Sequence, residues 1–308
     1  MSNKRTDMKL FIVALSTLVT ALLSTALQAQ VIHKEQSLYR NILVTQLGEK
    51  LCMKFSLRRK KNQSQSCVML DQPQKLVFNY TRMSMIGLIA NPNPKKVLII
   101  GLGGGSLINA IHHIAPEAHI TSVEIDEAVV RIAKKYFDVR ENEWHNMVTK
   151  DARVFVKRAL LKKKRGGGSY DMVVLDAFNG DYIPEHLMTY EFLSEVKGIL
   201  SDDGIIIANT FASGKLYDHE SETYHAALGD FYQVDAPNTN NRIILAGNRP
   251  LLNIEQFTAN SAKLKAALNV INVDVKVILE RIITKPRWDR TAQRLTDDYA
   301  PVNLLNKE

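Results

Sequence analysis

The sequence has little of what metal-dependent enzymes and enzymes with a serine or cysteine nucleophile usually display. Only 2 of its 308 residues are cysteines, and its 8 histidines are scattered without the spacing of metal ligands. It contains no G-x-S-x-G turn, and neither cysteine lies in the context of a cysteine–histidine nucleophile. We therefore expect no bound metal and no serine or cysteine nucleophile.

Concentrated positive charge is also scarce, although the formal net charge is +8. The basic residues are spread along the chain, apart from two short runs at residues 58–61 and 162–165. Both runs have the composition of solvated loops, and no recognisable nucleic-acid-binding module accompanies them. Nucleic acid is therefore not expected to be a partner.

The amino terminus has the order of a targeting segment. Lys4, Arg5 and Lys9 precede a largely apolar stretch, residues 10–27, which ends in small and polar residues with a cleavage position after Ala29. Serines and threonines within the stretch make it a poor permanent membrane span, but an uncleaved anchor that tethers the protein stays open. Because the positive charges precede the apolar stretch, either version predicts a body outside the cytoplasm, periplasmic or secreted.

The two cysteines, Cys52 and Cys67, flank a basic polar segment, which is the arrangement of a hairpin with a basic tip. An export signal and a cysteine pair support each other, so we expect a disulfide between them. The competing interpretation is two reduced, half-buried thiols.

The clearest motif is residues 96–126, which read as a strand, a glycine loop, a helix and a second strand. The run 97–100 is short, unbroken and rich in β-branched residues, as in a buried parallel strand. The second strand brings Glu124 and Asp126 to its carboxyl end, where a carboxylate can accept hydrogen bonds from ribose hydroxyls. This pattern predicts half of a nucleotide-binding fold, and the alternative is an ordinary βαβ unit. The glycines of the loop are Gly101, Gly103, Gly104 and Gly105, followed by Ser106.

Alternating strands and helices after the glycine loop predict an α/β fold with a doubly wound parallel sheet and ligands at the carboxyl ends of its strands. Residues 30–90 are expected to form a small antiparallel β domain with a linking helix. A Rossmann-like domain at 91–253 and a helical tail at 254–308 should follow. The expected β strands of the small domain lie at 41–45, 51–55 and 67–70, and long helices are expected at 78–89 and 185–200.

Five stretches in order make the chain resemble the spermidine synthase family of polyamine aminopropyltransferases: VLIIGLGGGS, VEID, KDARVF, YDMVVLDAFNGDYIPEHLMTYEF and LTDDYAPVNLL. The resemblance implies a small β domain before a methyltransferase-like Rossmann domain. It also implies a homodimer that binds decarboxylated S-adenosylmethionine and an amine acceptor.

The resemblance also implies roles for particular residues. Glu124 would hold the ribose, and Asp176 would be the catalytic proton acceptor. On the nucleoside side the implied residues are Gly101, Gly103 and Gly105 in the loop, with Asp151 and Ala152 beside the adenine. On the substrate side they are Tyr80, Asn179 and Asp181.

Four positions depart from the family pattern. Gly104 stands where the family usually has an acid, and Asn179 replaces the second acid of its D-x-x-D motif. Arg82 ends a run that is tyrosine-histidine-glutamate in the family, and Arg40 replaces a glutamine. The loss of acids and the gain of guanidinium groups disfavour the binding of a polycation, because like charges repel. All four changes are expected to fall on the acceptor side, with the nucleoside side kept, so we expect an acceptor that is not a normal polyamine.

Other functions stay open at this point. A methyltransferase could use S-adenosylmethionine itself, with Arg40 or Arg82 as the partner of the donor carboxylate. An exported protein would be separated from a donor made in the cytoplasm, which favours a non-catalytic binding protein. A dinucleotide oxidoreductase is a weaker candidate, because Ser106 stands where G-x-G-x-x-G has its last glycine.

Overall fold

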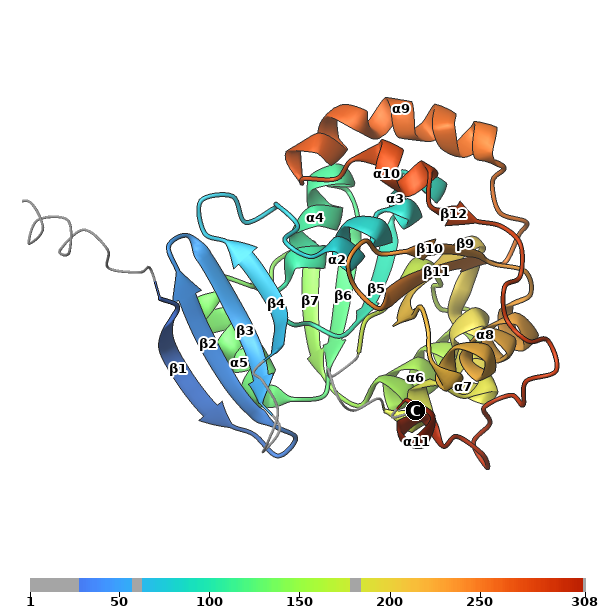
Figure 1. Ribbon diagram of the computed structural model, residues 1–308, viewed down its shortest axis with the longest axis horizontal. Coiled ribbons are helices and arrows are strands. Elements are labelled where there is room, and N and C mark those ends of the chain that lie inside the picture. Colours follow the sequence, from blue (N-terminus) through green and yellow to red (C-terminus); the bar gives the residue numbers. More distant parts are fainter. Residues whose placement is uncertain (1–27, 57–62, 178–183, 307–308) are drawn as a thin grey trace, which may run out of the picture.

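The computed structural model describes residues 28–56, 63–177 and 184–306 and contains two sheets (Figure 1). The smaller sheet lies at one end of the molecule, and the larger sheet forms its centre with helices on both faces. The prediction of a doubly wound α/β fold preceded by a small antiparallel sheet is confirmed.

The small sheet has the order β1-β2-β3-β4, and each neighbouring pair is antiparallel. Ile42, Val44 and Met53 are completely buried on its inner face. Sequence analysis missed β1, because an edge strand with mostly exposed side chains lacks an alternating apolar pattern. The bounds are β1 Gln30–Gln36, β2 Asn41–Leu47, β3 Lys50–Ser56 and β4 Gln63–Met69.

The large sheet has the order β12-β10-β11-β9-β8-β5-β6-β7. Its strands from β9 to β7 run parallel, and β10, β11 and β12 add an antiparallel edge. The strand order reverses at β5, so the adjacent carboxyl ends of β5 and β8 form the crevice where such sheets bind ligands. The bounds are β5 Lys96–Ile100, β6 His119–Glu124, β7 His145–Thr149, β8 Tyr170–Leu175, β9 Leu200–Phe211, β10 Tyr232–Asp235, β11 Asn241–Gly247 and β12 Ile282–Ile283.

The helices bury the two faces of this sheet in two separate cores. Val97 and Ile99 of β5 belong to one core, whereas Leu98 and Ile100 belong to the other. Burial on both faces explains the unbroken apolar run of this strand. On the first face lie α2 Asn79–Ser84, α3 Ile86–Ala90, α4 Ser106–Ile114, α5 Glu127–Tyr136 and α9 Ile254–Val270, and on the second lie α6 Ala152–Lys164, α7 Tyr190–Ile199 and α8 Lys215–Leu228.

Two predicted long helices are broken in the structure. Within the segment 78–89, α2 ends and α3 begins at Met85. The amide of Met85 donates to the carbonyl of Arg82. The segment 185–200 starts with a short 3-10 turn, η1 Glu185–Leu187. Its α-helix begins only after Thr189, whose hydroxyl caps it by accepting from the amide of Phe192.

The carboxyl-terminal tail is only partly helical. After α9 and α10 Val275–Leu279, the strand β12 pairs with β10 at the edge of the large sheet. The chain then crosses the surface beside α8 and ends in α11 Val302–Leu305 near α6 (Figure 1). No helix in the described ranges is long and apolar enough to span a membrane.

Candidate functional site

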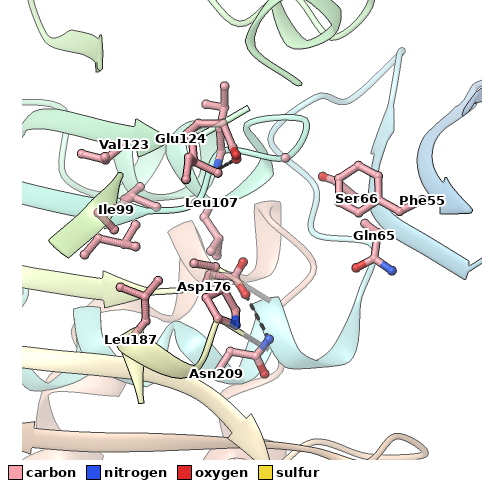
Figure 2. Close-up of a pocket in the computed structure, with 18 of the residues that line it drawn as sticks. Phe55, Gln65, Ser66, Ile99, Leu107, Val123, Glu124, Asp176, Leu187 and Asn209 are labelled. Atoms are coloured by element: carbon pink, nitrogen blue, oxygen red, sulfur yellow. Dashed lines mark hydrogen bonds between the residues drawn. The ribbon is translucent and has the colours of Figure 1, made fainter. Parts of the chain in front are cut away.

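A cavity of about 1150 Å³ opens between the small sheet and the carboxyl ends of β5, β6, β8 and β9 (Figure 2). The cavity is lined by the predicted residues Tyr80, Gly101, Gly103, Glu124, Asp151, Ala152 and Asp176, and by Arg40, but not by Gly105, Asp126 or Arg82. Asn179 and Asp181 lie outside the described residues. The cavity is large enough for a nucleoside together with a second small molecule.

The glycine loop passes very close to the strand that carries Asp176. Gly101 has a φ of +105°, and a Cβ atom at this position would lie 2.3 Å from the carbonyl oxygen of Asp176. Only glycine satisfies both conditions. Gly103, with a φ of +52°, also lines the cavity. Gly105 does not line the cavity, since it begins α4 and faces Val139.

Ser66 of the small sheet holds the glycine loop from the opposite side. Its Oγ accepts a hydrogen bond of 2.9 Å from the amide of Gly104, and Ser66 is itself buried. The neighbouring Cys67 forms a disulfide with Cys52, directly across the β3–β4 pair. The small sheet therefore supports the glycine loop directly, which the sequence did not indicate.

Glu124 reaches the cavity from the end of β6. Its two carboxylate oxygens accept from the amides of Leu102 at 3.3 Å and Asp126 at 3.0 Å. Burial raises the pKa of Glu124, while these two amides and the positive charge of Arg40 lower it. Backbone groups thus hold the carboxylate in place, and each oxygen keeps a further lone pair for a ligand hydroxyl.

Arg40 lies beside Glu124, not on the side of Asp176. Its Nε is 3.6 Å from Oδ2 of Asp126, and its guanidinium lies 4.4 Å from the centre of the Phe55 ring. Burial lowers the pKa of Arg40, although Glu124 and Asp126 raise it. The expectation that all four departures lie on the acceptor side is therefore wrong for Arg40.

Arg82 and Gly104, unlike Arg40, lie away from the cavity wall. The Arg82 guanidinium donates to the carbonyls of Leu76 and Val77 and to the side chain of Asn79. It cannot pair with a donor carboxylate from that position. A Cβ atom at Gly104 would lie 2.6 Å from the ring of Phe137, so the site of the missing acid is filled by an aromatic side chain.

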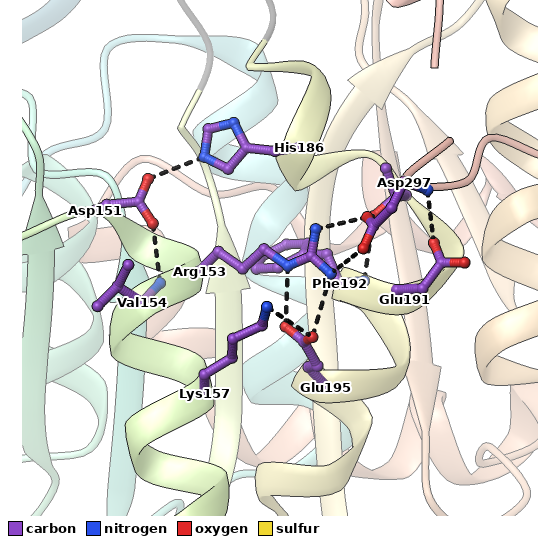
Figure 3. Close-up of polar contacts among 10 residues, drawn as sticks. Asp151, Arg153, Val154, Lys157, His186, Glu191, Phe192, Glu195 and Asp297 are labelled. Atoms are coloured by element: carbon purple, nitrogen blue, oxygen red, sulfur yellow. Dashed lines mark hydrogen bonds and ion pairs between the residues drawn. The ribbon is translucent and has the colours of Figure 1, made fainter. Parts of the chain in front are cut away.

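Asp151 and Ala152 border the cavity at the start of α6. One oxygen of Asp151 caps this helix by accepting from the amide of Val154 at 2.9 Å. The other lies 2.9 Å from Nε2 of His186, which also lines the cavity (Figure 3). Sequence analysis missed His186, because nothing in its local pattern relates it to Asp151.

Behind Asp151, a network of charged groups ties the carboxyl-terminal segment to the site (Figure 3). The Arg153 guanidinium donates to both oxygens of Asp297, at 2.6 and 2.7 Å, and to Glu195. Asp297 also accepts from the Thr189 hydroxyl at 2.8 Å. Asp297 does not line the cavity, so its role is to fasten the chain end beneath the site.

Asp176 stands at the end of β8, directly below the glycine loop. Oδ2 accepts from the Tyr80 hydroxyl at 3.3 Å. Oδ1 accepts from Nδ2 of Asn209 at 3.0 Å (Figure 2). Burial raises the pKa of Asp176 to about 6, against the opposing effect of these two hydrogen bonds. Burial also raises the pKa of Tyr80, which therefore stays protonated as a donor. Asp176 is thus a carboxylate at neutral pH with the pKa of a competent general base.

Asn209 is a further residue of the site that sequence analysis missed. A weak signal exists, since an asparagine interrupts the otherwise apolar part of β9. Its partner on the other side is Asn241 of β11, which donates to Oδ1 of Asn209 at 2.9 Å. In the described ranges, no group of histidine, cysteine and acidic side chains has the arrangement of a metal site.

Comparisons with known proteins identify the family of the chain. The model of the spermine/spermidine synthase domain matches residues 77–239. A polyamine aminopropyltransferase of Vibrio vulnificus is 42% identical over 296 residues, which cover 94% of this chain and 97% of the relative.

Two solved structures have a similar fold at low sequence identity. A probable spermidine synthase from Corynebacterium glutamicum superimposes with a TM-score of 0.63 at 18% identity, covering 76% of this chain and 87% of that one. Human methyltransferase-like protein 13 in complex with SAH gives a TM-score of 0.53 at 22% identity, covering 69% of this chain and 93% of that one. These two likenesses show the fold. The matched domain model and the match over nearly the whole sequence show that the chain belongs to the spermine/spermidine synthase family.

Proposed function

We propose that the protein is an aminopropyltransferase that moves the aminopropyl group of a decarboxylated S-adenosylmethionine-type nucleoside to an amine. The observation that carries this proposal is the position of Asp176, a buried carboxylate with a raised pKa in the same cavity as Glu124. The name of the Vibrio vulnificus relative supports the same reaction.

The nucleoside is proposed to lie along the ends of β5, β6 and β7. Glu124 would accept hydrogen bonds from the ribose hydroxyls, and Asp151 would border the adenine. A cationic sulfonium is favoured here, because Glu124, Asp151 and Asp176 place three carboxylates on the described part of the cavity wall.

The transfer step requires a neutral amine and an aligned leaving group. Asp176 takes a proton from the acceptor ammonium, which frees the nitrogen lone pair. That lone pair attacks the methylene carbon bonded to sulfur, and a carbon–nitrogen bond forms as the carbon–sulfur bond breaks. The electron pair of the broken bond stays on sulfur, so the product nucleoside is a neutral thioether.

We propose further that the acceptor is not a normal polyamine. On the described wall, Asp176 is the one carboxylate that remains once Glu124 and Asp151 are assigned to the nucleoside. The wall beside it is made of neutral side chains, including those of Phe78, Phe211 and Asn241. An acceptor with one reactive amine and a neutral or apolar end suits this wall better than a polycation does.

The site of action is proposed to lie outside the cytoplasm, with residues 10–27 as a cleaved leader or a membrane tether. The charge order of the leader and the disulfide in the small sheet support this location. Intact-mass measurement of the native protein tests it. A product that begins near Gln30 is expected for cleavage, and a full-length cytoplasmic protein would overturn the proposal.

The test of the reaction compares two donors and two acceptor classes. The protein is incubated with decarboxylated S-adenosylmethionine or with S-adenosylmethionine, each with putrescine or with a series of monoamines, and products are identified by mass spectrometry. Aminopropylated monoamine and methylthioadenosine are expected, and both should disappear in Asp176→Asn.

Each other outcome points to a definite alternative. Formation of S-adenosylhomocysteine and a methylated product would replace the proposal with a methyltransferase. Efficient aminopropylation of putrescine would leave the reaction standing but overturn the altered acceptor. Nucleoside binding without turnover in any combination would indicate a binding protein.

A further inference from the structure

Two side-chain amides stand in series behind Asp176. Nδ2 of Asn241 donates to Oδ1 of Asn209 at 2.9 Å, and Nδ2 of Asn209 donates to Oδ1 of Asp176 at 3.0 Å. Figure 2 shows the second of these contacts at the floor of the cavity. Asn241 thus reaches the carboxylate through one intermediate side chain.

Strand pairing places the two asparagines on the same face of the sheet. Asn209 of β9 lies opposite Ile243 of β11, and Asn241 is two positions before Ile243. Side chains two positions apart on a strand point to the same face, so the two amides are diagonal neighbours. Their contact follows directly from the register of these strands.

A buried cluster locks that register next to the two amides. Arg242 is completely buried, and its guanidinium donates to Thr210 Oγ1 at 2.9 Å and to Glu220 Oε2 at 3.0 Å. Thr210 in turn donates to the carbonyl of Arg242, and Glu220 accepts from the amide of Phe211. The ends of β9 and β11 therefore have little freedom to shift.

The order of donors and acceptors in this series is determined by its last member. An ionised carboxylate can only accept, so Asn209 must turn its NH₂ group toward Asp176. Its carbonyl oxygen then faces Asn241, which must donate. If Asn241 could only accept, the Asn209 amide would turn over and present an oxygen to the Asp176 carboxylate.

We propose that Asn241 is a positioning residue for the transfer reaction, because it orients the Asn209 amide so that its NH₂ group holds Asp176 as an aligned proton acceptor. This inference rests on the proposed role of Asp176 as the base. It also explains why an asparagine occupies the first position of β11, beside the neutral part of the cavity wall.

Few other groups near Asp176 titrate among the described residues. Tyr80 of α2 is in direct contact and remains protonated. Glu220, whose pKa is raised by burial to about 7, is paired with Arg242 next to Thr210, and this pair is the same in both variants compared below. A substitution at position 241 is therefore expected to act on Asp176 through the orientation of the Asn209 amide.

The experiment compares Asn241→Asp with Asn238→Asp. The first variant puts an acceptor-only side chain against Asn209. The second adds the same charge in the exposed turn before β11, where Asn238 does not line the cavity.

Both variants should retain their nucleoside affinity. In Asn241→Asp we expect the acidic limb of the kcat/KM profile to move up by about one pH unit, with a lower kcat. Asn238→Asp should move it much less.

A second measurement separates this inference from the proposed reaction. NMR titration of the aspartate side-chain carbons, assigned with Asp176→Asn, follows the Asp176 carboxyl without any turnover. Its midpoint should rise in Asn241→Asp and, by a smaller amount, in the uncharged Asn241→Ala. If the midpoint is the same in Asn241→Asp and Asn238→Asp, the positioning role is wrong. If the midpoint moves but the wild type transfers nothing, only the proposed function fails.

Discussion

The proposed nucleoside half and the proposed proton-accepting half of the cavity differ in what holds their functional groups. Glu124 is held by the backbone amides of Leu102 and Asp126, and Asp151 by the amide of Val154 together with the side chain of His186. Asp176 is held by the side chains of Tyr80 and Asn209. The first half therefore depends largely on the course of the main chain, and the second on side chains from separate elements.

This difference predicts how substitutions should act in each half. A carboxylate anchored by backbone groups keeps its position when neighbouring side chains change. A carboxylate anchored by side chains changes its pKa and direction when any one of them is replaced. Substitutions should therefore have separable effects on nucleoside affinity and on transfer, and the following predictions test that separation.

The largest effect is expected for Asp176→Asn. Loss of the proton acceptor should lower kcat by about 10²–10⁴-fold, whereas nucleoside affinity should stay nearly unchanged. Turnover assays and calorimetry with methylthioadenosine measure the two quantities. Asp202→Asn, an exposed change on β9, is the matched control and should resemble the wild type. A parallel loss of nucleoside affinity in Asp176→Asn would show that the two halves are not separable.

Removal of the disulfide should destabilise the small sheet and weaken its contact with the glycine loop. The crosslink closes a loop of 15 residues, which in the chain-entropy model contributes about 3 kcal/mol. Denaturant unfolding of the double variant Cys52→Ser, Cys67→Ser measures this loss. We also expect weaker nucleoside binding, because Ser66 adjoins Cys67 and accepts from Gly104. Unchanged affinity in the folded double variant would mean that the loop does not need the sheet.

Glu124→Gln should weaken nucleoside binding by about tenfold to a hundredfold, or roughly 1.5–3 kcal/mol. The ribose loses a charged acceptor, and the new NH₂ group faces a backbone amide that it cannot satisfy. Calorimetry measures the change. Glu127→Gln, an exposed change in the first turn of α5, carries the same loss of charge and should bind normally. Equal weakening in both variants would assign the effect to net charge.

The burial of Asp176 should also make stability depend on pH. Its pKa is about 6 in the folded state and 3.8 when unfolded. The free energy of unfolding should therefore fall as pH rises from 3.8 to 6, and Asp176 should not lower it below this window. Asp176→Asn should therefore be more stable than the wild type at pH 8, by about 1–3 kcal/mol relative to the same comparison at pH 4. Denaturant unfolding at the two pH values measures this, and an equal difference at both would contradict the assigned pKa.

The smallest effect is expected for Tyr80→Phe. The Tyr80 hydroxyl lowers the pKa of Asp176, so its removal should move the acidic limb of the rate profile to higher pH, by less than about one unit. Nucleoside affinity should not change. Tyr39→Phe removes the hydroxyl of an exposed tyrosine of the cavity wall that is not a hydrogen-bond partner of Asp176, and it serves as the control. A downward shift of the limb would show that Tyr80 does not stabilise the carboxylate.

Local pattern was sufficient for much of the fold. The strand–glycine–helix–strand unit was predicted correctly because each step has its own signal: the apolar run at β5, the glycines, and the acid at the end of β6. The edge strand β1 and the break at Met85 were missed. An exposed edge strand has no apolar alternation, and a break at an ordinary residue has no proline or glycine to mark it.

The sequence alone was enough to identify Glu124, Asp151 and Asp176 as carboxylates at strand ends, because these positions are local features of a βα repeat. The positions of Arg40, Ser66, His186, Asn209 and Asn241 followed only from the tertiary structure. Each of these side chains lies on an element distant in sequence from the group it contacts, and strand register or sheet packing brings the two together. The same dependence placed Arg40 beside Glu124, where its charge acts on the nucleoside half of the cavity.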